Sequence, residues 1–147
     1  LATTTWKVGG GTEANIQSSI PTTAYKNEVG SSASSTTYGA QIGLMYASDY
    51  YYSASPSAWT LVGYNESDAT KDYRAAMSTN WLYLRDNEWA ISRDSDSTNC
   101  AFRVTGTGAV FYCNVFSYNG VRPSFNLESS VKYVSGSGSM SNPIRVN

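Results

Sequence analysis

The run Asp94-Ser95-Asp96-Ser97 contains the side chains most able to hold a metal ion. Its carboxylate and hydroxyl oxygens suit Ca²⁺, but that ion takes about six to eight oxygen ligands. The run lacks both the spacing of a known calcium loop and the bidentate Glu that completes one. We therefore interpret it as a solvated turn and expect no metal and no other cofactor.

Residues able to support catalysis are few. The chain has no His, which excludes Ser-His-Asp and Cys-His catalysis and the usual zinc sites. Cys100 would need a cationic neighbour to form a thiolate, and Arg103 is near it in sequence. The carboxylates that a fold could pair are Asp68, Asp72, Glu88 and Glu128. No motif brings any two of them together, so we expect no enzyme, with a hydrolase or oxidase as a remote alternative.

Length and composition indicate a single domain, residues 1–147, with a weakly charged surface. Apolar residues make up 41% of the chain, whereas charged residues make up 14%, against the usual quarter or so. Ser, Thr, Asn and Gly supply the remaining polarity, as in many secreted β-proteins. The net charge of −1 offers no basic surface to nucleic acid, and no apolar run reaches the roughly 18 residues of a membrane span.

Residues 80–127 alternate between framework-like pieces and polar or aromatic insertions. The framework pieces, predicted as short strands and turns, include Trp81, Glu88–Ile91, Phe102–Val104, Gly108, Val110 and Gly120–Pro123. The insertions are Arg85–Asn87, Asp94–Asn99 and Phe111–Asn119. This layout is typical of a scaffold that displays a binding surface, where Tyr offers rigid contact area with a polar tip. We assign Trp59, Trp81 and Trp89 to the core.

The first part of the chain is predicted to contain strands and loops. Trp6–Val8 is a strand, Asn15–Tyr25 is weakly structured because Pro21 breaks any regular element, and Gly30–Thr37 is a polar loop. Tyr38–Tyr46 is an apolar strand.

Two helical segments are predicted next. One is a short turn through Tyr50–Tyr52, capped by Ser48-Asp49 and ended by Pro56, with at least one of its three Tyr outside the core. Ala58–Val62 is a second strand or a short turn. Ser67–Met77 is the best helix candidate, with an irregular loop as the alternative because its Thr and Asp residues are poor helix formers.

A hairpin is predicted around Thr105–Gly108. A three-residue loop with Gly108 in the left-handed conformation pairs Val104 with Val110, whereas a two-residue loop pairs Val104 with Ala109. We prefer the first register because it keeps the apolar residues on one face.

The register also decides whether the two cysteines can form a disulfide. The first register leaves Cys100 and Cys113 on opposite faces, and the second lets them form a disulfide, which an extracellular setting would permit. Both outcomes stay open, with two free thiols preferred.

The last strands are Val131–Val134 and Ile144–Val146, separated by a Ser-Gly turn. This terminal hairpin is expected to pair with the N-terminal strand near Trp6. The sequence therefore predicts an α+β fold of short antiparallel strands and hairpins, with one or two short helices and with paired N- and C-terminal strands.

Four segments carry a resemblance to a known family: IGLMYASDYYYS, NEWAISRDSD, AFRVTGTGAVF and GVRPSFNL. Together, over roughly Tyr38 to Val146, they resemble surface proteins of gut bacteria with a C-type-lectin-like domain of the formylglycine-generating-enzyme type. Some members carry a type IV pilin-like N-terminal helix. The chain begins at Leu1 without an initiator Met, so we expect it to be cut from a longer precursor whose upstream anchor or pilin-like helix is removed.

Similar folds serve as the variable proteins of diversity-generating retroelements, in which a fixed scaffold displays mutated residues that bind diverse ligands. The resemblance implies that residues 80–127 are the ligand-display region. The implied contact residues are Arg85, Asp86, Asn87, Asp94, Asp96, Ser97, Thr98, Asn99, Arg103, Thr105, Phe111, Tyr112, Asn114, Phe116, Ser117, Tyr118 and Asn119. Cys100 and Cys113 lie in the same stretches, which favours incidental thiols.

The implied function is binding at the bacterial cell surface, outside the cell. The partners would be a protein or glycan ligand on a cell or phage surface, and other pilin subunits if the chain is a structural subunit of a filament. The catalytic cysteines and metal motifs of the enzyme branch are missing. The Glu-Pro-Asn and Gln-Pro-Asp signatures of calcium-dependent lectins are missing as well, and fold alone does not give function.

Arg122 is predicted to support the scaffold. Pro123 holds it in an extended conformation, and its five donors can tie loop carbonyls or a carboxylate. We expect it to be largely buried, and bonded to backbone or to an acid such as Glu88.

Overall fold

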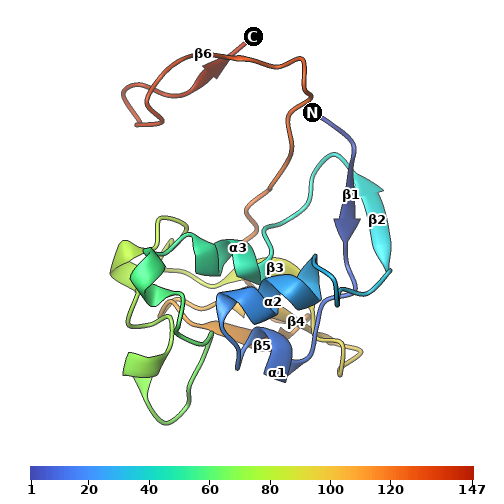
Figure 1. Ribbon diagram of the computed structural model, residues 1–147, viewed down its shortest axis with the longest axis vertical. Coiled ribbons are helices and arrows are strands. Elements are labelled where there is room, and N and C mark those ends of the chain that lie inside the picture. The colour runs from blue at the N-terminus through green and yellow to red at the C-terminus, as the bar shows by residue number, and fades with distance from the viewer.

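The computed structural model describes residues 1–147 as an α+β fold of short helices and antiparallel sheets (Figure 1). In chain order the elements are β1 (Thr4–Lys7), α1 (Glu13–Ile16), α2 (Pro21–Glu28), β2 (Thr37–Ala40), α3 (Ala47–Tyr52), β3 (Glu88–Arg93), β4 (Cys100–Val104), β5 (Val110–Asn114), β6 (Tyr133–Ser135) and β7 (Arg145–Val146). Short 3₁₀ turns occupy Pro56–Ala58, Ala69–Lys71 and Met77–Thr79. None of the helices has the length and apolar character that a membrane crossing requires.

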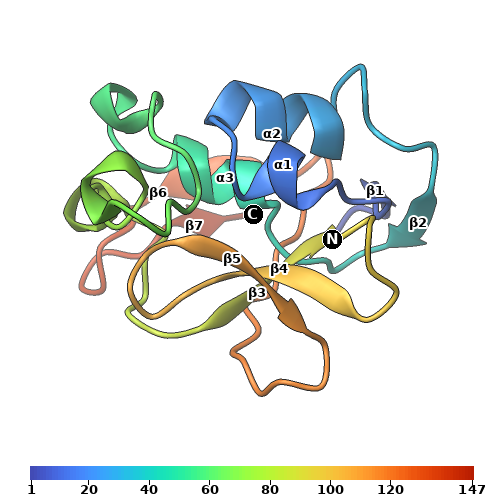
Figure 2. The same ribbon diagram turned by 90° about the horizontal axis from the view of Figure 1, so that it is seen from below.

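The strands form three separate sheets. β3, β4 and β5 make the central sheet, and α1, α2 and α3 lie over one of its faces (Figure 2). β1 pairs with β2, with Trp6 opposite Tyr38, and β6 pairs with β7 in a hairpin set apart from the other elements (Figure 1). The predicted pairing of the N- and C-terminal strands is therefore wrong. The chain after Pro123 lies beside the N-terminus instead, where the amide of Ala2 donates to the carbonyl of Asn126 at 2.9 Å.

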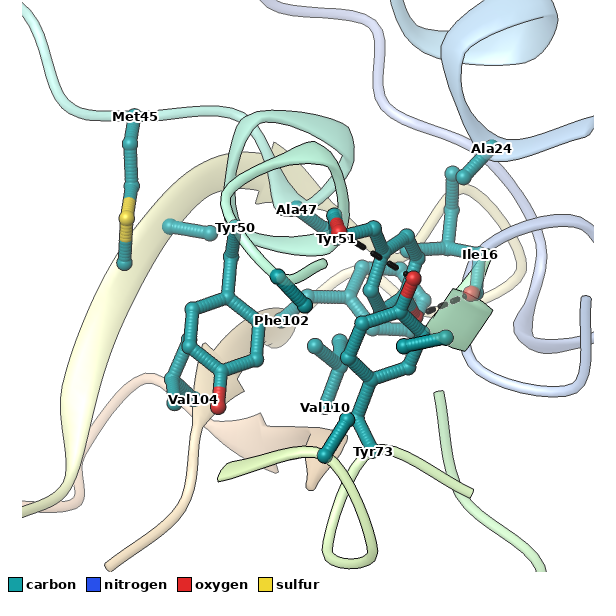
Figure 3. Close-up of a cluster of buried hydrophobic side chains, with 14 residues drawn as sticks. Ile16, Ala24, Met45, Ala47, Tyr50, Tyr51, Tyr73, Phe102, Val104 and Val110 are labelled. Atoms are coloured by element: carbon teal, nitrogen blue, oxygen red, sulfur yellow. Dashed lines mark hydrogen bonds between the residues drawn. The ribbon is translucent and has the colours of Figure 1, made fainter. Parts of the chain in front are cut away.

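The core lies between the helices and the central sheet. Phe102 and Val110 of the sheet are fully buried against Tyr50, Tyr51 and Tyr73 (Figure 3). The buried phenols are satisfied: the hydroxyl of Tyr73 donates to the carbonyl of Tyr51 at 3.1 Å, and that of Tyr50 donates to the hairpin turn at 2.8 Å. Burial raises the pKa of all three phenols, so they act as neutral donors. The third Tyr of α3 is only half-buried, as predicted.

The stretch predicted to be weakly structured contains two helices, so that prediction is wrong. Thr12 caps α1, because its Oγ1 accepts from the amide of Asn15 at 3.2 Å. Pro21 begins α2 instead of interrupting it, since the N–H that proline lacks has no intrahelical partner at that position. Ile16 and Ala24 are fully buried, so packing stabilises both short helices.

The predicted helical turn after the first apolar strand is confirmed as α3, but it begins earlier. Tyr46 is the N-cap residue, and Oδ2 of Asp49 accepts from its amide at 2.8 Å. The carboxylate of Glu28, at the end of α2, accepts from the first amides of α3, those of Ala47 at 2.9 Å and Ser48 at 2.8 Å. One helix therefore caps the next.

Ser67–Met77 does not form the predicted helix, and the irregular-loop alternative is correct. Asp68 caps only a single 3₁₀ turn. Asp72 is fully buried in an extended conformation. Its carboxylate accepts from the amide of Asn65 at 2.8 Å and from Nε of Arg74 at 2.9 Å, which holds the chain out of a helix.

The predicted tryptophan core is wrong at all three positions. Trp59 lies at the surface and Trp81 is 77% exposed, whereas Trp6, in β1, is buried. Trp89 is half-buried on the sheet face that the helices leave open. The space beneath α3 is filled by its own tyrosines and by Tyr73.

The β4–β5 hairpin confirms the preferred register. Val104 pairs with Val110, and Gly108 has a φ of +87°, the left-handed conformation that a side chain disfavours. In this register Cys100 and Cys113 are not cross-strand partners, and both thiols are free.

The other predicted strands are only partly confirmed. The strand expected over Tyr38–Tyr46 ends at Ala40. Gly43 then forms an isolated antiparallel β-bridge with Ser124. The terminal hairpin forms as β6 and β7, with shorter strands than predicted.

Candidate ligand-binding surface

The outer face of the central sheet, which the helices leave open, carries several of the predicted display residues. Trp89, Arg103 and Phe111 are cross-strand neighbours in β3, β4 and β5 and therefore share this face. The loop after β5 projects on the side opposite the helices (Figure 2). Within it, Phe116 is 83% exposed and Tyr118 is fully exposed. These two rings are the most accessible aromatic side chains of the predicted set.

Backbone hydrogen bonds fix both ends of this loop. At its start the amide of Val115 donates to the carbonyl of Asn99 at 2.9 Å, and at its end the amide of Gly120 donates to the carbonyl of Asn87 at 2.8 Å. In addition, Nη1 of Arg103 donates to the side-chain oxygen of a loop Asn at 2.9 Å. The framework therefore sets the path of the loop while its aromatic rings remain in solvent.

The predicted display residues do not form one patch. The exposed members are Arg85, Asp86, Asp96, Thr98, Asn99, Asn114, Phe116 and Tyr118. The half-buried members are Asn87, Ser97, Arg103, Thr105, Phe111, Tyr112, Ser117 and Asn119. Arg85–Asn87 and Thr105 lie where β3 begins and β4 ends, whereas Asp96–Asn99 and Asn114–Ser117 lie at the opposite end of the sheet. The loop after β5 begins in the second group and returns to the first, where the amide of Gly120 donates to the carbonyl of Asn87.

Two predicted contact residues make hydrogen bonds within the scaffold. Asp94 is buried. Its amide donates to the carbonyl of Cys100 at 3.0 Å, and its Oδ1 accepts from the amide of Asp96 at 3.1 Å. It shapes the turn between β3 and β4, so its prediction as a displayed residue is corrected. Asn87 is half-buried, and its Oδ1 accepts from the amide of Gly106 at 3.0 Å, which ties the start of β3 to the β4–β5 turn.

Arg122 makes the predicted bonds to Glu88 and to the backbone, but it is half-buried instead of largely buried. Its Nε and Nη2 donate to the two carboxylate oxygens of Glu88 at 2.7 and 2.6 Å, and Nη2 also donates to the carbonyl of Leu82 at 2.5 Å. The Arg122 side chain is 28% exposed, and Glu88 is buried. The pair joins the first residue of β3 to the segment that follows the loop after β5, residues 115–119, which we name the display loop.

The carboxylates considered for acid–base chemistry are not paired with one another. Three of them form ion pairs with separate basic residues: Asp68–Lys71 at 3.2 Å, Asp72–Arg74 at 2.5 Å and Glu88–Arg122 at 2.6 Å. Glu128 is exposed in the C-terminal segment. No group of three or more Cys, Asp or Glu side chains is placed to hold a metal ion.

A hollow of about 610 Å³ opens at the outer edge of β5, beside the outer sheet face of Trp89, Arg103 and Phe111, which we name the display face. Its aromatic lining is Tyr64, Phe111 and Tyr112, and Glu13 and Glu66 add carboxylates. Tyr64 is perpendicular to Phe111 at a centroid distance of 4.9 Å, and Phe111 stacks on Tyr112 at 5.0 Å. Sequence reasoning missed Tyr64 and both Glu residues, because no motif or periodicity links the three distant segments that the fold brings together here.

Buried polar groups fix the walls of this hollow. Gln17 is buried, and its Oε1 accepts from the amide of Tyr112 at 3.1 Å, which satisfies an edge donor of β5. The guanidinium of Arg74 lies 4.8 Å from the Tyr64 ring centroid. Hydrogen bonding to the buried Asp72 raises the pKa of Arg74, so the guanidinium stays protonated. The negative charge of the Asp72 carboxylate offsets the positive charge of this guanidinium. The aromatic wall is therefore held in place before any ligand arrives.

Comparison of the chain with protein-family models, with curated proteins and with solved structures finds no match.

Proposed function

We propose that this chain is a non-enzymatic binding module of a bacterial cell surface, located outside the cell. Its scaffold displays an aromatic and polar surface to a protein or glycan ligand on another cell or on a phage. The observation that carries the proposal is the loop after β5, which is anchored at both ends while Phe116 and Tyr118 remain exposed. Exposed aromatic rings on a fixed backbone give large contact area at low entropic cost on binding.

We further propose that the α+β fold is a C-type-lectin-like fold of the formylglycine-generating-enzyme type. In support, helices cover one face of a short antiparallel sheet, the loop after β5 projects on the other side, and the Gly-Val-Arg-Pro segment is tied to β3 through Glu88. The separate terminal hairpin departs from the expected closure of such a fold. An experimental structure compared with known C-type-lectin-like domains tests this assignment.

Diversification of the display loop is part of the proposal. Substitution at Phe116 or Tyr118 removes little buried surface, because both rings are exposed. A scaffold of this kind tolerates many residues at these positions, as the resemblance to variable proteins of diversity-generating retroelements implies. Sequencing sibling genes in the source genome is the direct check, since changes spread evenly over the framework would contradict diversification.

Binding is tested with the labelled full chain on arrays of bacterial surface proteins, phage proteins and glycans. We expect a discrete set of ligands, whose binding is lost in the double variant Phe116→Ser/Tyr118→Ser. The matched control is Tyr133→Ser/Met140→Ser, which removes two exposed side chains from the terminal hairpin. Equal loss in both variants, or no specific ligand, contradicts the assignment.

A structural subunit of a pilin-like filament is the second candidate, and the terminal hairpin favours it. The hydrogen bonds of residues 128–147 all lie within that segment, while Tyr133, Met140 and Ile144 are exposed. An isolated two-stranded hairpin is marginal in water, so packing on a neighbouring subunit would stabilise it. Sedimentation of the full chain and of a chain lacking residues 128–147 tests this: assembly that needs the hairpin supports a subunit role, and identical monomers contradict it.

A further inference from the structure

The hollow beside β5 has the size of a subsite for one side chain or a small group. Its volume of about 610 Å³ falls within the range of small-ligand sites, and it lies between α1, the segment 62–66 and the β5 edge. Phe111 belongs both to this hollow and to the outer sheet face, where it is the cross-strand neighbour of Arg103. A ligand resting on the display face therefore has direct access to the hollow.

The chemistry of the lining is aromatic and acidic. Phe111 and Tyr112 supply π-faces, whose negative quadrupole attracts cations, whereas Arg74 already lies over the ring of Tyr64. Glu13 and Glu66 are exposed at the hollow, and no basic residue forms an ion pair with either one.

The guanidinium beside the hollow does not compensate these carboxylates. Arg74 lies over Tyr64, but its guanidinium is held by the fully buried Asp72 through Nε at 2.9 Å and Nη2 at 2.5 Å. The side-chain Nε2 of Gln17 also donates to Oε1 of Glu13 at 3.0 Å, which orients the Glu13 carboxylate. The hollow thus keeps an uncompensated negative charge beside aromatic faces.

We infer that this hollow binds a compact cation, the ammonium or guanidinium group of a Lys or Arg side chain presented by a protein ligand. The inference rests on the proposed binding function and specifies its ligand: a protein with a protruding basic residue. The aromatic faces contribute cation–π attraction, and the two carboxylates add charge-assisted hydrogen bonds. An acidic group is repelled there, and a neutral sugar would leave both carboxylates uncompensated.

The test is an amide NMR titration of the ¹⁵N-labelled full chain with Nα-acetyl-lysine methylamide and Nα-acetyl-arginine methylamide. We expect saturable shifts of the amides of Gln17, Tyr64, Phe111 and Tyr112, with Kd on the order of 1 mM, as suits a single anchoring side chain. The Nε-acetylated lysine probe, which has the same stem but no charge, should bind at least tenfold more weakly. Added salt should weaken the charged probes and leave the acetylated probe unaffected.

The variant Glu13→Gln/Glu66→Gln is expected to lower affinity for the cationic probes at least tenfold while preserving the shape of both side chains. Glu128→Gln, at an exposed carboxylate outside the hollow, is the matched control and should bind like the parent. Unchanged binding in the double variant, equal binding of the acetylated probe, preferential binding of N-acetylglucosamine, or no shift in the hollow each overturns the inference. Array binding that depends on Phe116 and Tyr118 while the hollow stays unshifted overturns this inference alone, whereas absence of any array ligand overturns the proposed function.

Discussion

The two faces of the central sheet differ although the same strands build both. On the helix side Phe102 and Val110 are fully buried, whereas on the outer side Arg103 and Phe111 are half-buried. Because side chains alternate along a strand, neighbouring residues of β4 or β5 lie in opposite environments. Core positions and partly exposed positions are therefore separated here by single steps in the sequence.

The largest expected difference between the faces comes from removing a ring on each side. Phe102→Ala leaves a cavity beneath α3 and should lower the free energy of unfolding by about 3–5 kcal/mol. Phe116→Ala, the matched control on the display loop, should change it by less than about 0.5 kcal/mol. Urea denaturation of both variants measures the difference. A similar loss in Phe116→Ala would mean that the loop belongs to the core.

The second prediction concerns the ion pair that joins the scaffold to the display loop. Arg122→Ala leaves the buried carboxylate of Glu88 without its cation and should destabilise the fold by about 3 kcal/mol, the lower end for buried pairs because the arginine is partly exposed. Arg145→Ala, at an exposed arginine of β7, is the control and should melt like the parent. Thermal melts decide the matter. If Arg122→Ala keeps the parent melting temperature but loses ligand binding, scaffold and site are assigned the wrong way round.

The third prediction uses pH to separate a buried support group from exposed ones. Glu28 is buried, and its carboxylate accepts from the amides of Ala47 and Ser48 and from the hydroxyl of Ser92. Glu28→Ala leaves these donors unsatisfied and should cost about 2–3 kcal/mol. Urea denaturation at pH 7 checks this value, with Glu128→Ala as the exposed control.

The pH dependence of that loss has a defined sign. Burial raises the pKa of Glu28 above its ordinary value near 4.5, although its hydrogen bonds partly offset this. A raised pKa in the folded state means that the native protein binds the proton more tightly than the unfolded chain does. The contribution of Glu28 to stability is therefore full below the ordinary pKa and falls as pH rises through the raised pKa of the folded state. The loss in Glu28→Ala should therefore grow as pH is lowered from 7 toward 4.5. A loss that shrinks over this range would show a lowered pKa instead.

The local features of the display region could be predicted from sequence. The register of the β4–β5 hairpin followed from the alternation of apolar residues and from Gly108, both of which act over a few residues. The role of Arg122 followed from Pro123 and from the apolar neighbours of that segment. Each of these choices depends on local backbone geometry or on side-chain alternation.

The predictions that were wrong concern features that depend on partners distant in sequence. α1 and α2 are too short to be stable alone, and they form because Ile16 and Ala24 pack in a core that the sequence pattern does not reveal. Asp72 is extended although the sequence around it follows a helical pattern, because its carboxylate binds groups outside its own turn, including the amide of Asn65. The hollow combines Glu13 of α1 with segments near residues 64 and 112, so no local pattern could predict it.

The smallest effect on stability, and the most selective effect on function, is expected at Tyr118. Its side chain is fully exposed, so Tyr118→Ala removes almost no buried surface and should change the free energy of unfolding by less than about 0.5 kcal/mol. The ring lies on the anchored loop of the display side, so its loss should weaken ligand binding at least tenfold, as truncation of a central aromatic contact does. Tyr133→Ala, at an exposed tyrosine of β6, is the control for loss of a surface ring and should bind like the parent. Binding measured on the array ligands, together with melts of both variants, tests the contrast. A destabilised Tyr118→Ala, or equal binding loss in the two variants, would remove the distinction between the supporting and the displaying side of the sheet.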